Sequence, residues 1–426
     1  MRFTQLSDWL RWQEGLHPNA IELGLERVAA TLRRLGWQRP QCPVVTVAGT
    51  NGKGSSVALL DSILSSGGYR VGCFTSPHLR SYNERITLAG QPVSDAALIA
   101  AFERIDAARA PDTLTFFEFN TLAALLTFEA ASLDAIILEV GLGGRLDAVN
   151  VVDADVALIS SIALDHCQWL GADIESIGRE KAGIFRAARP AVFGARHMPS
   201  SVGQLAEQLG TPLLQLGVDF DYHHGVHDWE WHSSQTRYAA LPRPALAGEV
   251  QFENAAAVLA VLDCLQSRLP LVRAAIEMGL LGVRLVGRFQ RIGAEPEWIV
   301  DVAHNPAAAH TLAAQLGERS CQGRTLAVSS VLGDKDIEGI AGALAGCIDG
   351  WIVAGLGGDR ALPAERVAQR LQSGGATVLA TAPTVAEACE VAQRMATKSD
   401  RIVAFGSFLT VAAVLAWFDA RSGRVP

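Results

Sequence analysis

The fold of this chain is decided by residues 44–56, which spell VVTVAGTNGKGSS. Residues 44–47 are all β-branched, as is typical of a buried parallel strand. Three glycines then surround Lys53, and an amphipathic helix is predicted over residues 56–66. A strand, a glycine loop and a helix cradle phosphate, because glycines let backbone N–H groups approach the oxygens while the helix N-terminus and a lysine add positive charge.

This loop is a variant of the strict pattern G-x-x-x-x-G-K-[ST], because Val47 stands at the first glycine and Gly54 follows the lysine. A glycine-rich turn without phosphate is the alternative, and the strand before it and the helix after it favour phosphate binding. Lysine is scarce, and the 36 basic residues include only Lys53, Lys181, Lys335 and Lys398. A lysine that remains is expected to be needed as lysine, because ammonium and guanidinium groups differ in size, hydration and pKa.

Length and composition indicate a two-domain protein with a large core, since the chain has 426 residues, of which 49% are hydrophobic and 19% charged. A net charge of −8 without a basic cluster argues against nucleic-acid binding. The N-terminus lacks the apolar stretch of a signal peptide, and the apolar residues 408–418 are too few to span a bilayer. The seven cysteines include no C-x-x-C pair. We expect a cytoplasmic protein without nucleic-acid or membrane partners.

Strand and helix patterns alternate along the N-terminal part of the chain, which predicts a doubly wound α/β domain with a mostly parallel sheet. A plausible helix N-cap is Ser94. Further strands are predicted over residues 70–74, 134–140, 155–159, 190–193 and 212–216. Helices are predicted over residues 4–13, 22–36, 94–108, 116–132 and 254–268.

Residues 218–241 differ in character, because aromatic, His and Asp residues alternate there. This pattern predicts a small antiparallel hairpin or sheet. Four histidines fall within it, at positions 223, 224, 227 and 232. A metal site is one interpretation, but alternation along a strand scatters side chains over both faces, so an exposed aromatic-polar sheet is preferred.

A second, smaller Rossmann-like α/β domain is predicted after a linker at residues 279–290, which glycines and arginines punctuate. The predicted domains are residues 1–287 and 288–426. Strands are predicted over residues 298–303, 325–331, 351–354, 377–380 and 401–405. Helices are predicted over residues 306–316, 337–345, 363–372, 384–396 and 408–419.

Two polar residues stand at strand ends of the first domain, where open α/β sheets place their ligands, and a third candidate, Lys181, is predicted on a helix or at its start. Glu139 ends the apolar strand DAIILEV, which is the arrangement that holds Mg²⁺ near a nucleotide. His166 follows another strand, and Lys181 belongs to GREKAGIF. Taken singly each has an ordinary structural interpretation: a strand end, a satisfied histidine and a solvated helix face.

Taken together, the motifs point to one family. The chain carries, in order, GTNGKGS, TSPHL, YNERI, LEVGLGGRLDAVN, LDH, REKAGIF, GRFQ and DVAHNP. From about residue 10 to the C-terminus it resembles the folylpolyglutamate synthase family, and most closely its bifunctional bacterial dihydrofolate synthase/folylpolyglutamate synthase members. The Mur ligases of cell-wall synthesis share this broad architecture.

The resemblance implies an ATP-dependent amide ligase with dihydropteroate, reduced folates and L-glutamate as substrates. ATP phosphorylates a substrate carboxylate, and the amine of glutamate then attacks the acyl phosphate. It also implies two Mg²⁺ ions, leaves room for a monovalent cation such as K⁺, and suggests a monomer. Phosphorylation supplies a leaving group that a carboxylate lacks, and the transfer needs charge neutralised by metal and lysine.

The resemblance also implies roles for individual residues. The phosphates would be held by Asn51, Gly52, Lys53, Gly54 and Ser55. Mg²⁺ would be bound by Ser76, Glu139, His166 and Lys181, with Lys181 carbamylated. Catalytic roles would belong to Lys53, Lys181 and His166. The nucleotide would also contact Asn254, Arg288, Asp301 and His304. The pterin substrate would be bound by Ile21, Glu22, Leu23, Thr115, Phe116, Phe117, Glu118, Leu146, Asp147 and Ala148.

Some of these positions have local alternatives. Asn254 suits a helix N-cap, His304 and Asn305 suit a turn before proline, and the rings at 116 and 117 suit core packing as well as stacking on a pterin. Departures from the family pattern are small. Ser55 and Ser56 replace threonines that are common in relatives, and Cys167 follows His166 at a variable position.

Other functions compete with this one. A nucleotide-dependent switch is suggested by TKSD at residues 397–400, but that motif precedes a strand of the other domain. A folate-binding module without catalysis has no need of a phosphate loop. A monofunctional folylpolyglutamate synthase and a Mur-type ligase acting on a UDP-sugar peptide remain the enzyme alternatives, and the motifs on the pterin side favour the folate ligase.

Overall fold

The structure, a computed structural model, describes residues 2–358 and 360–422. Its contacts divide the chain into two compact units. The first unit consists of the chain up to Ala163, together with Cys167–Ala245 and Gln251–Arg284. The second consists of Leu164–His166, Leu246–Val250 and the chain from Leu285 onward. The division of functional domains between residues 287 and 288 stays a prediction.

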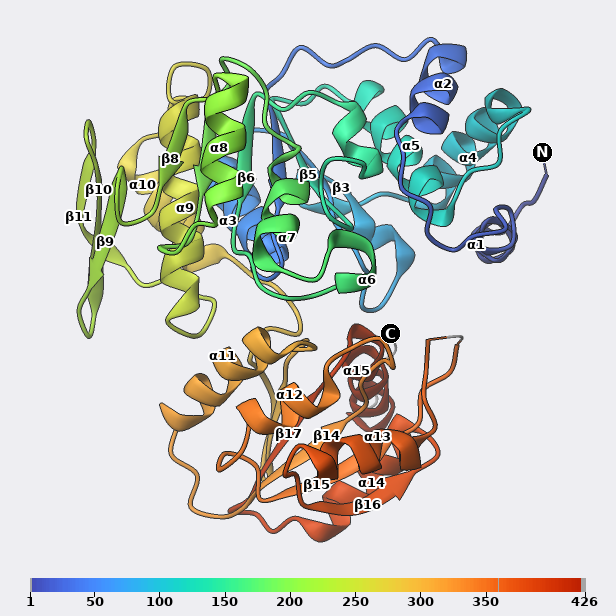
Figure 1. Cartoon of the computed structure of the whole chain (residues 1–426), viewed down its shortest axis with the longest axis vertical. Coiled ribbons are helices and arrows are strands. Elements are labelled where there is room, and N and C mark those ends of the chain that lie inside the picture. The colour runs from blue at the N-terminus through green and yellow to red at the C-terminus, as the bar shows by residue number, and fades with distance from the viewer. Residues whose placement is uncertain (1, 359, 423–426) are drawn as a thin grey trace. The chain divides into compact units, whose positions relative to one another are not determined.

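An eight-stranded sheet forms the centre of the first unit, with strand order β4-β3-β2-β5-β1-β6-β7-β8. All neighbours are parallel except β2 with β3 and β3 with β4. Figure 1 shows helices on both sides of this sheet, as predicted for a doubly wound domain. The strands are β1 Val44–Ala48, β2 Val71–Phe74, β3 Ile86–Leu88, β4 Gln91–Pro92, β5 Ala135–Glu139, β6 Val156–Ile159, β7 Ala191–Phe193 and β8 Leu213–Gln215.

The helices of this unit carry the predicted site residues mainly at their ends. They are α1 Leu6–Glu14, α2 Glu26–Leu35, α3 Lys53–Ser66, α4 Asp95–Arg109, α5 Phe116–Glu129, α6 Cys167–Leu170, α7 Ile174–Ala182, α8 Ser200–Leu209, α9 Val250–Leu265 and α10 Arg273–Gly282, with 3₁₀ turns η1 Tyr82–Arg85 and η2 Ala148–Val151. The predicted N-cap of α4 is confirmed, because the Ser94 side chain accepts a hydrogen bond from the Ala97 N–H.

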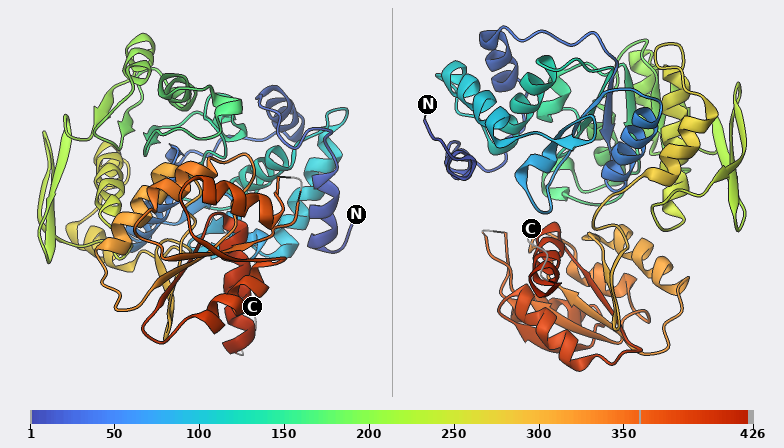
Figure 2. Two further views of the ribbon diagram at one scale, coloured as in Figure 1. Left: turned by 60° about the horizontal axis from the view of Figure 1, so that its bottom comes forward. Right: turned by 180° about the vertical axis from the view of Figure 1, so that it is seen from behind.

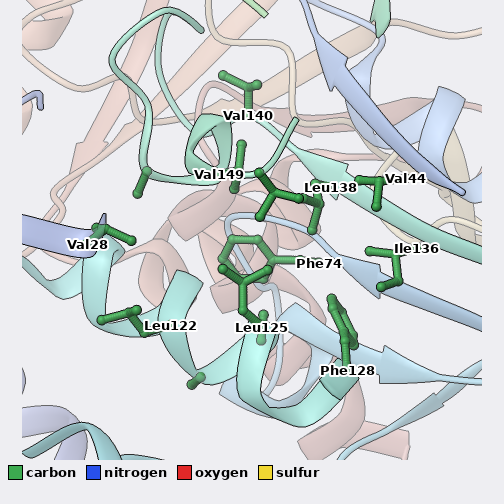
Figure 3. Packing of buried hydrophobic residues seen from close by; sticks show 14 of the residues in the cluster. Val28, Val44, Phe74, Leu122, Leu125, Phe128, Ile136, Leu138, Val140 and Val149 are labelled. Atoms are coloured by element: carbon green, nitrogen blue, oxygen red, sulfur yellow. The ribbon is translucent and has the colours of Figure 1, made fainter. Parts of the chain in front are cut away.

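One part of the hydrophobic core of this unit lies between the central strands and α5. Every residue of β1 and β5 is buried, which agrees with their continuous apolar sequences. Figure 3 shows the Phe74 ring of β2 beside Leu125 of α5 and Leu138 of β5. Because both central strands are fully buried, the residues at their ends are held in fixed positions. These are the phosphate loop, which follows β1, and Glu139, the last residue of β5.

A small antiparallel sheet, β11-β10-β9, confirms the prediction for residues 218–241. Figure 2 shows it beside α9 and α10. The strands are β9 Phe220–His224, β10 Asp228–Ser233 and β11 Arg237–Pro242. The described residues contain no group of three or more His, Cys, Asp and Glu side chains that could hold a metal. Instead, His224 stacks on Phe252 of α9 at 4.7 Å, and His223 stacks on His232 at 6.2 Å between ring centres.

The second unit contains a six-stranded sheet of order β12-β13-β17-β14-β15-β16, parallel except for the β12–β13 pair. This is the predicted smaller α/β domain. Its strands are β12 Gln290–Ala294, β13 Glu297–Val300, β14 Thr325–Ser329, β15 Gly350–Ala354, β16 Val378–Ala382 and β17 Arg401–Phe405. Its helices are α11 Pro306–Gly317, α12 Ile337–Ala343, α13 Ala364–Ser373, α14 Val385–Met395 and α15 Phe408–Ser422.

Several predicted boundaries are wrong. Helix α3 begins at Lys53 rather than at residue 56, and α2 begins at Glu26 rather than at residue 22. Asn254 lies inside α9 and does not open it, so the N-cap alternative for Asn254 fails. The predicted linker at 279–290 overlaps the end of α10 and the start of β12. The sequence patterns also missed α8, β3 and β4.

None of the helices in the described residues is both long enough and apolar enough to cross a membrane.

Candidate active site

The phosphate loop joins the end of β1 to the start of α3, and two of its glycines permit close backbone approaches. Gly52 has φ +86°, and a Cβ there would lie 2.6 Å from Oδ1 of Asn254. A Cβ on Gly49 would lie 2.0 Å from the Ser160 hydroxyl oxygen. Only glycine fits at such distances. Asn254, predicted to contact the nucleotide, is therefore beside the loop although it lies 202 residues after Gly52 in the chain.

Hydrogen bonds to Ser161, just after β6, hold the loop in place. The Thr50 N–H donates to the Ser161 carbonyl at 2.8 Å, and the Asn51 N–H donates to the Ser161 hydroxyl at 3.2 Å. The Lys53 ammonium donates to the carbonyls of Gly49 at 3.0 Å and Thr50 at 3.3 Å. Lys53 is also the first residue of α3, so the positive charge of the lysine and the partial positive charge of the helix N-terminus lie at the same place.

Lys181 comes to the same loop from the last turn of α7. Its amino nitrogen donates to the Gly49 carbonyl at 3.0 Å, and the residue is 4% exposed. Two of the four lysines of the chain thus share one carbonyl oxygen. Gly144 of the LEVGLGGRLDAVN motif makes this possible, because a Cβ there would lie 2.8 Å from the Lys181 carbonyl oxygen.

Glu139 stands at the end of β5 next to the phosphate loop, since it is paired in register with Val47 of β1. It is 5% exposed, and its Oε2 accepts a hydrogen bond from the Ser76 N–H at 3.1 Å. Buried carboxylate and hydroxyl oxygens are the donors that Mg²⁺ prefers, so Glu139 and Ser76 fit the predicted metal. Lys181 fits only after carbamylation, because an ammonium group has no lone pair to offer.

The three segments predicted to bind the pterin are joined to one another. The Gly24 N–H donates to the Leu146 carbonyl at 3.2 Å, which connects residues 21–23 to residues 146–148. The Arg27 guanidinium, 21% exposed, bonds both Glu22 and Glu118, and its Nε lies 3.0 Å from Oε1 of Glu118. Arg27 was not predicted, although two carboxylates at one site call for a cation and Arg27 is the arginine nearest to Glu22 in the sequence.

Helix α5 begins with a capping box that uses two of the predicted residues. The Glu118 N–H donates to the Thr115 hydroxyl at 3.3 Å, and Glu118 Oε2 accepts from the Thr115 N–H at 2.8 Å. The two rings that follow differ. Phe117 packs against Phe74, and a Cβ on Gly141 would lie 2.6 Å from the Phe117 ring, which fits the core-packing alternative. Phe116 has the Arg85 guanidinium 5.5 Å from its ring centre.

Asp147 is buried at the N-cap of η2, where its carboxylate accepts hydrogen bonds from the Leu142 and Val149 N–H groups at 2.8 and 3.0 Å. Burial raises its pKa to about 6, although the backbone N–H groups and the Lys53 charge act in the opposite direction. A carboxyl group that titrates near neutrality can accept or donate a hydrogen bond, which suits recognition of a pterin ring.

In the second unit, Asp301 organises the backbone around two predicted nucleotide residues. Its oxygens accept from the Phe289 N–H at 2.7 Å and the Ala303 N–H at 2.8 Å, and burial raises its pKa. The Arg288 guanidinium lies 5.4 Å from the Phe408 ring centre. His304 Nδ1 is 2.8 Å from the Val302 carbonyl oxygen. The GRFQ and DVAHNP motifs therefore form one local structure within this unit.

The contacts of segment Leu164–His166 place it with the second unit, and Asp165 is its centre. The Lys335 ammonium donates to Asp165 at 2.6 Å, and Asn305 Nδ2 donates to it at 3.1 Å. Burial raises the pKa of Asp165, but His304 and Lys335 outweigh it, and the net pKa is well below the usual range. His166 Nε2 lies 3.3 Å from the Lys335 nitrogen.

Of these residues, Asp165 and Lys335 were given no role by the sequence reasoning. The scarcity of lysine was the available signal for Lys335. Asn305 also caps α11, since its Oδ1 accepts from the Ala308 N–H at 2.9 Å, so the turn alternative holds alongside any function. Lys398, by contrast, is 87% exposed in its side chain and pairs with Glu295 at 3.5 Å.

The chain matches two domains of the Mur ligases. The Mur ligase middle domain matches residues 47–262, and the Mur ligase glutamate ligase domain matches residues 287–408. Among curated proteins, the dihydrofolate synthase/folylpolyglutamate synthase of Escherichia coli K12 is 45% identical over 98% of this chain and 96% of its own.

Solved structures agree with these sequence matches. E. coli FolC in complex with DHPP and ADP superposes with a TM-score of 0.93 at 44% identity, over 98% of this chain and 99% of that one. A bifunctional folylpolyglutamate synthase/dihydrofolate synthase with Mn, AMPPNP and L-glutamate bound has a TM-score of 0.89 at 44% identity, over 97% and 98% of the two chains.

Proposed function

This chain belongs to the dihydrofolate synthase/folylpolyglutamate synthase family of Mur ligases, and from that membership we propose that it joins L-glutamate to dihydropteroate and to reduced folates with ATP. The first reaction makes dihydrofolate, and the second lengthens the glutamate tail of a folate. Relatives with ADP, AMPPNP, Mn and L-glutamate bound support ATP, a divalent cation and glutamate as its ligands.

The chemistry proceeds in two transfers. An oxygen of the substrate carboxylate attacks the γ-phosphorus of ATP, so that ADP leaves and an acyl phosphate forms. The α-amine of glutamate then attacks the acyl carbon, a tetrahedral intermediate collapses, phosphate leaves and the amine loses a proton. Both steps require the negative charge of the transferring phosphoryl group to be neutralised and water to be excluded.

The phosphate loop supplies the first requirement. The backbone N–H groups at the start of α3 and the Lys53 ammonium hold the phosphates. The ammonium is already positioned at the loop, because it donates a hydrogen bond to the Gly49 carbonyl. Ser76, Glu139, His166 and carbamylated Lys181 would hold Mg²⁺. When bound, Mg²⁺ polarises the phosphoryl oxygens and offsets their charge. Arg288, Asp301, His304 and Asn254 are proposed to complete nucleotide binding.

The pterin substrate is proposed to bind where the three joined segments meet. Asp147, Glu22 and Glu118 supply hydrogen-bond acceptors there, and Phe116 supplies an aromatic face. Arg27 and the backbone hydrogen bond between Gly24 and Leu146 keep the segments in place. This cluster favours a folate-type substrate over the UDP-sugar peptide of a Mur ligase.

One observation carries the proposal. The phosphate loop after β1, whose Gly49 carbonyl accepts hydrogen bonds from Lys53 and Lys181, stands beside the buried carboxylate at the end of β5. The test is release of ADP from ATP and glutamate with dihydropteroate, with tetrahydrofolate, and with a UDP-sugar peptide as control. We expect ADP release and product amide with the first two. Activity with tetrahydrofolate alone would identify a monofunctional folylpolyglutamate synthase, and activity with the UDP-sugar peptide alone would contradict the proposal.

We place this reaction in the cytoplasm. All seven cysteines are free thiols, as is usual for proteins of a reducing compartment.

A further inference from the structure

An arginine outside the predicted site residues is buried beside them. Arg85, the last residue of η1, is only 8% exposed. Its carbonyl oxygen accepts a hydrogen bond from the Thr75 N–H at 2.9 Å, directly before Ser76, whose N–H bonds Glu139. The backbone therefore fixes Arg85 close to the carboxylate that is proposed to hold Mg²⁺.

The loop that carries Arg85 is rigidly held by Glu84. The two carboxylate oxygens of Glu84 accept hydrogen bonds from the N–H groups of Leu79, Arg80 and Ser81, at 2.9 to 3.0 Å. A side chain on such a loop loses little entropy when it binds a ligand, because its backbone is ordered beforehand.

The guanidinium of Arg85 has aromatic and neutral surroundings. Its central carbon lies 5.5 Å from the Phe116 ring centre and 5.7 Å from the Tyr82 ring centre. Its Nε donates to Nδ1 of His78 at 2.9 Å. Burial and the Arg85 charge lower the pKa of His78, which keeps that ring neutral and its Nδ1 able to accept.

What this guanidinium lacks is a carboxylate in direct contact, since Glu139 acts on it only through its charge. Throughout residues 2–358 and 360–422, no carboxylate forms an ion pair with Arg85. Its two terminal amino groups have no hydrogen-bond acceptor there either. Burial lowers its pKa, and the negative charge of Glu139 only partly offsets that cost. A buried cation without a paired anion is expensive, so such an arginine is normally retained to bind one.

The geometry points to Arg85 as the residue that binds the substrate carboxylate, the group that receives the phosphoryl group, through its two terminal amino groups. This inference rests on the proposed function. A guanidinium fork matches a carboxylate with two parallel hydrogen bonds. In dihydropteroate the carboxylate is attached to a benzene ring, and the walls beside Arg85 are the aromatic rings of Phe116 and Tyr82.

A purely structural Arg85 would tie its loop to His78 and to the two rings. The two roles are separated by a ligand that lacks the charge. We would measure binding of dihydropteroate and of its primary carboxamide by calorimetric titration to wild type, Arg85→Met and Arg104→Met. Arg104 is an exposed arginine of α4 in the same unit, so its replacement is the matched control.

Wild type and Arg104→Met should bind the carboxylate about 10- to 100-fold more tightly than the carboxamide, which is the range for hydrogen bonds to a charged group. Arg85→Met should bind the two ligands within about threefold of each other. A structural arginine would weaken both ligands equally and leave the ratio unchanged, and that result would overturn the inference.

Arg85→Lys protects the test against misfolding. If Arg85→Met shows no cooperative thermal unfolding, the same ratio is measured for Arg85→Lys, which keeps the charge but not the fork. The ratio should then fall below that of wild type, and an unchanged ratio would again overturn the inference. An assay of ADP release by the wild type with dihydropteroate separates failure of the proposed function from failure of the Arg85 inference. No ADP release would refute the proposed function. ADP release together with an unchanged binding ratio would refute only the role of Arg85.

Discussion

Among single residues, Lys181 has the most unusual position. Its buried amino group donates a hydrogen bond to the Gly49 carbonyl oxygen, which also accepts one from Lys53. Carbamylation needs an unprotonated amine and converts it into an oxygen ligand for Mg²⁺. Lys181→Arg keeps a cation but cannot be carbamylated. We predict that kcat falls on the order of 10³-fold, because a ligand of the metal that neutralises the phosphoryl group is lost.

The control for Lys181→Arg is Lys398→Arg, which makes the same change at an exposed lysine of the second unit and should leave kcat unchanged. In Lys181→Ala, short-chain carboxylic acids added to the assay should restore part of the activity by supplying the missing carboxylate. Near-normal kcat in Lys181→Arg would refute the carbamate and leave Lys181 as a simple cation for phosphate.

Asp147 makes a prediction about pH. Its folded-state pKa of about 6 lies above its usual value of 3.8, so the folded protein binds this proton more tightly than the unfolded chain does. The contribution of Asp147 to stability therefore increases as the pH falls from about 6 towards 4. Asp147→Asn is neutral at every pH. Relative to wild type, its free energy of unfolding should fall by up to about 3 kcal/mol between pH 8 and pH 4.

The measurement is urea unfolding of wild type and Asp147→Asn at several pH values. Taking the difference between the two proteins removes the other titrating groups, such as Asp165, whose lowered pKa acts in the opposite direction. A difference that does not change with pH would mean that Asp147 has the same pKa in the folded protein as in the unfolded chain, which would contradict the raised pKa.

Between residues and the whole chain, the elements around Arg27 hold together the segments of the proposed pterin site. Arg27 on α2 joins Glu22, in the segment before it, to Glu118 in the first turn of α5. Arg27→Met leaves the buried Glu118 without its cation, which should destabilise the protein by about 3 kcal/mol. It should also raise the KM for dihydropteroate more than it lowers kcat, because the segment 21–23 is released while the phosphate loop is untouched.

Arg33→Met is the matched control, since Arg33 is exposed on the same helix and its Nε donates to the Ala29 carbonyl within that helix. Arg27→Lys should be intermediate, because lysine keeps the charge but cannot reach two carboxylates with a planar fork. Steady-state kinetics and thermal unfolding are measured together. A lower Tm with an unchanged KM would assign Arg27 to stability alone.

Local sequence patterns predicted elements well where one element decides its own structure. The β-branched run before the phosphate loop gave β1, and alternation of aromatic and polar residues gave the three-stranded sheet. They failed where a distant element decides. Gly279 looked like a linker residue, but it lies in α10 where a Cβ would be 2.4 Å from Cα of Ile63, so the glycine serves the packing of two helices. Asn254 looked like a cap, but it faces Gly52 from the middle of α9.

The same limit applies to the candidate site. Motifs indicated residues that bear recognisable chemistry, such as Lys53, Glu139 and Lys181. They did not indicate Arg27 and Arg85, because the reason for each arginine is a neighbour far away in the sequence. Glu118, which pairs with Arg27, lies 91 positions after it in the sequence, and Phe116, whose ring contacts Arg85, lies 31 positions after that arginine. No local pattern encodes such pairs.

For the whole molecule, the question is how one chain would perform the two ligations proposed for it. The chain contains one phosphate loop, and Glu139 beside it is the one carboxylate predicted to bind Mg²⁺. Two activities that each consume ATP must then share this loop. Glu139→Gln keeps the shape of the side chain and can still accept from the Ser76 N–H, but it removes the charge that would hold the metal. Glutamylation of dihydropteroate and of tetrahydrofolate should therefore be lost together, each by on the order of 10²-fold or more in kcat.

Glu180→Gln, at an exposed ion pair with Arg145 next to Lys181, should keep both activities and controls for nonspecific effects. Both rates are measured by product amide rather than by ADP alone, so that uncoupled ATP hydrolysis is not counted. If either activity survived Glu139→Gln while the other was lost, the two ligations would have to use separate ATP sites, and a single phosphate loop would not suffice.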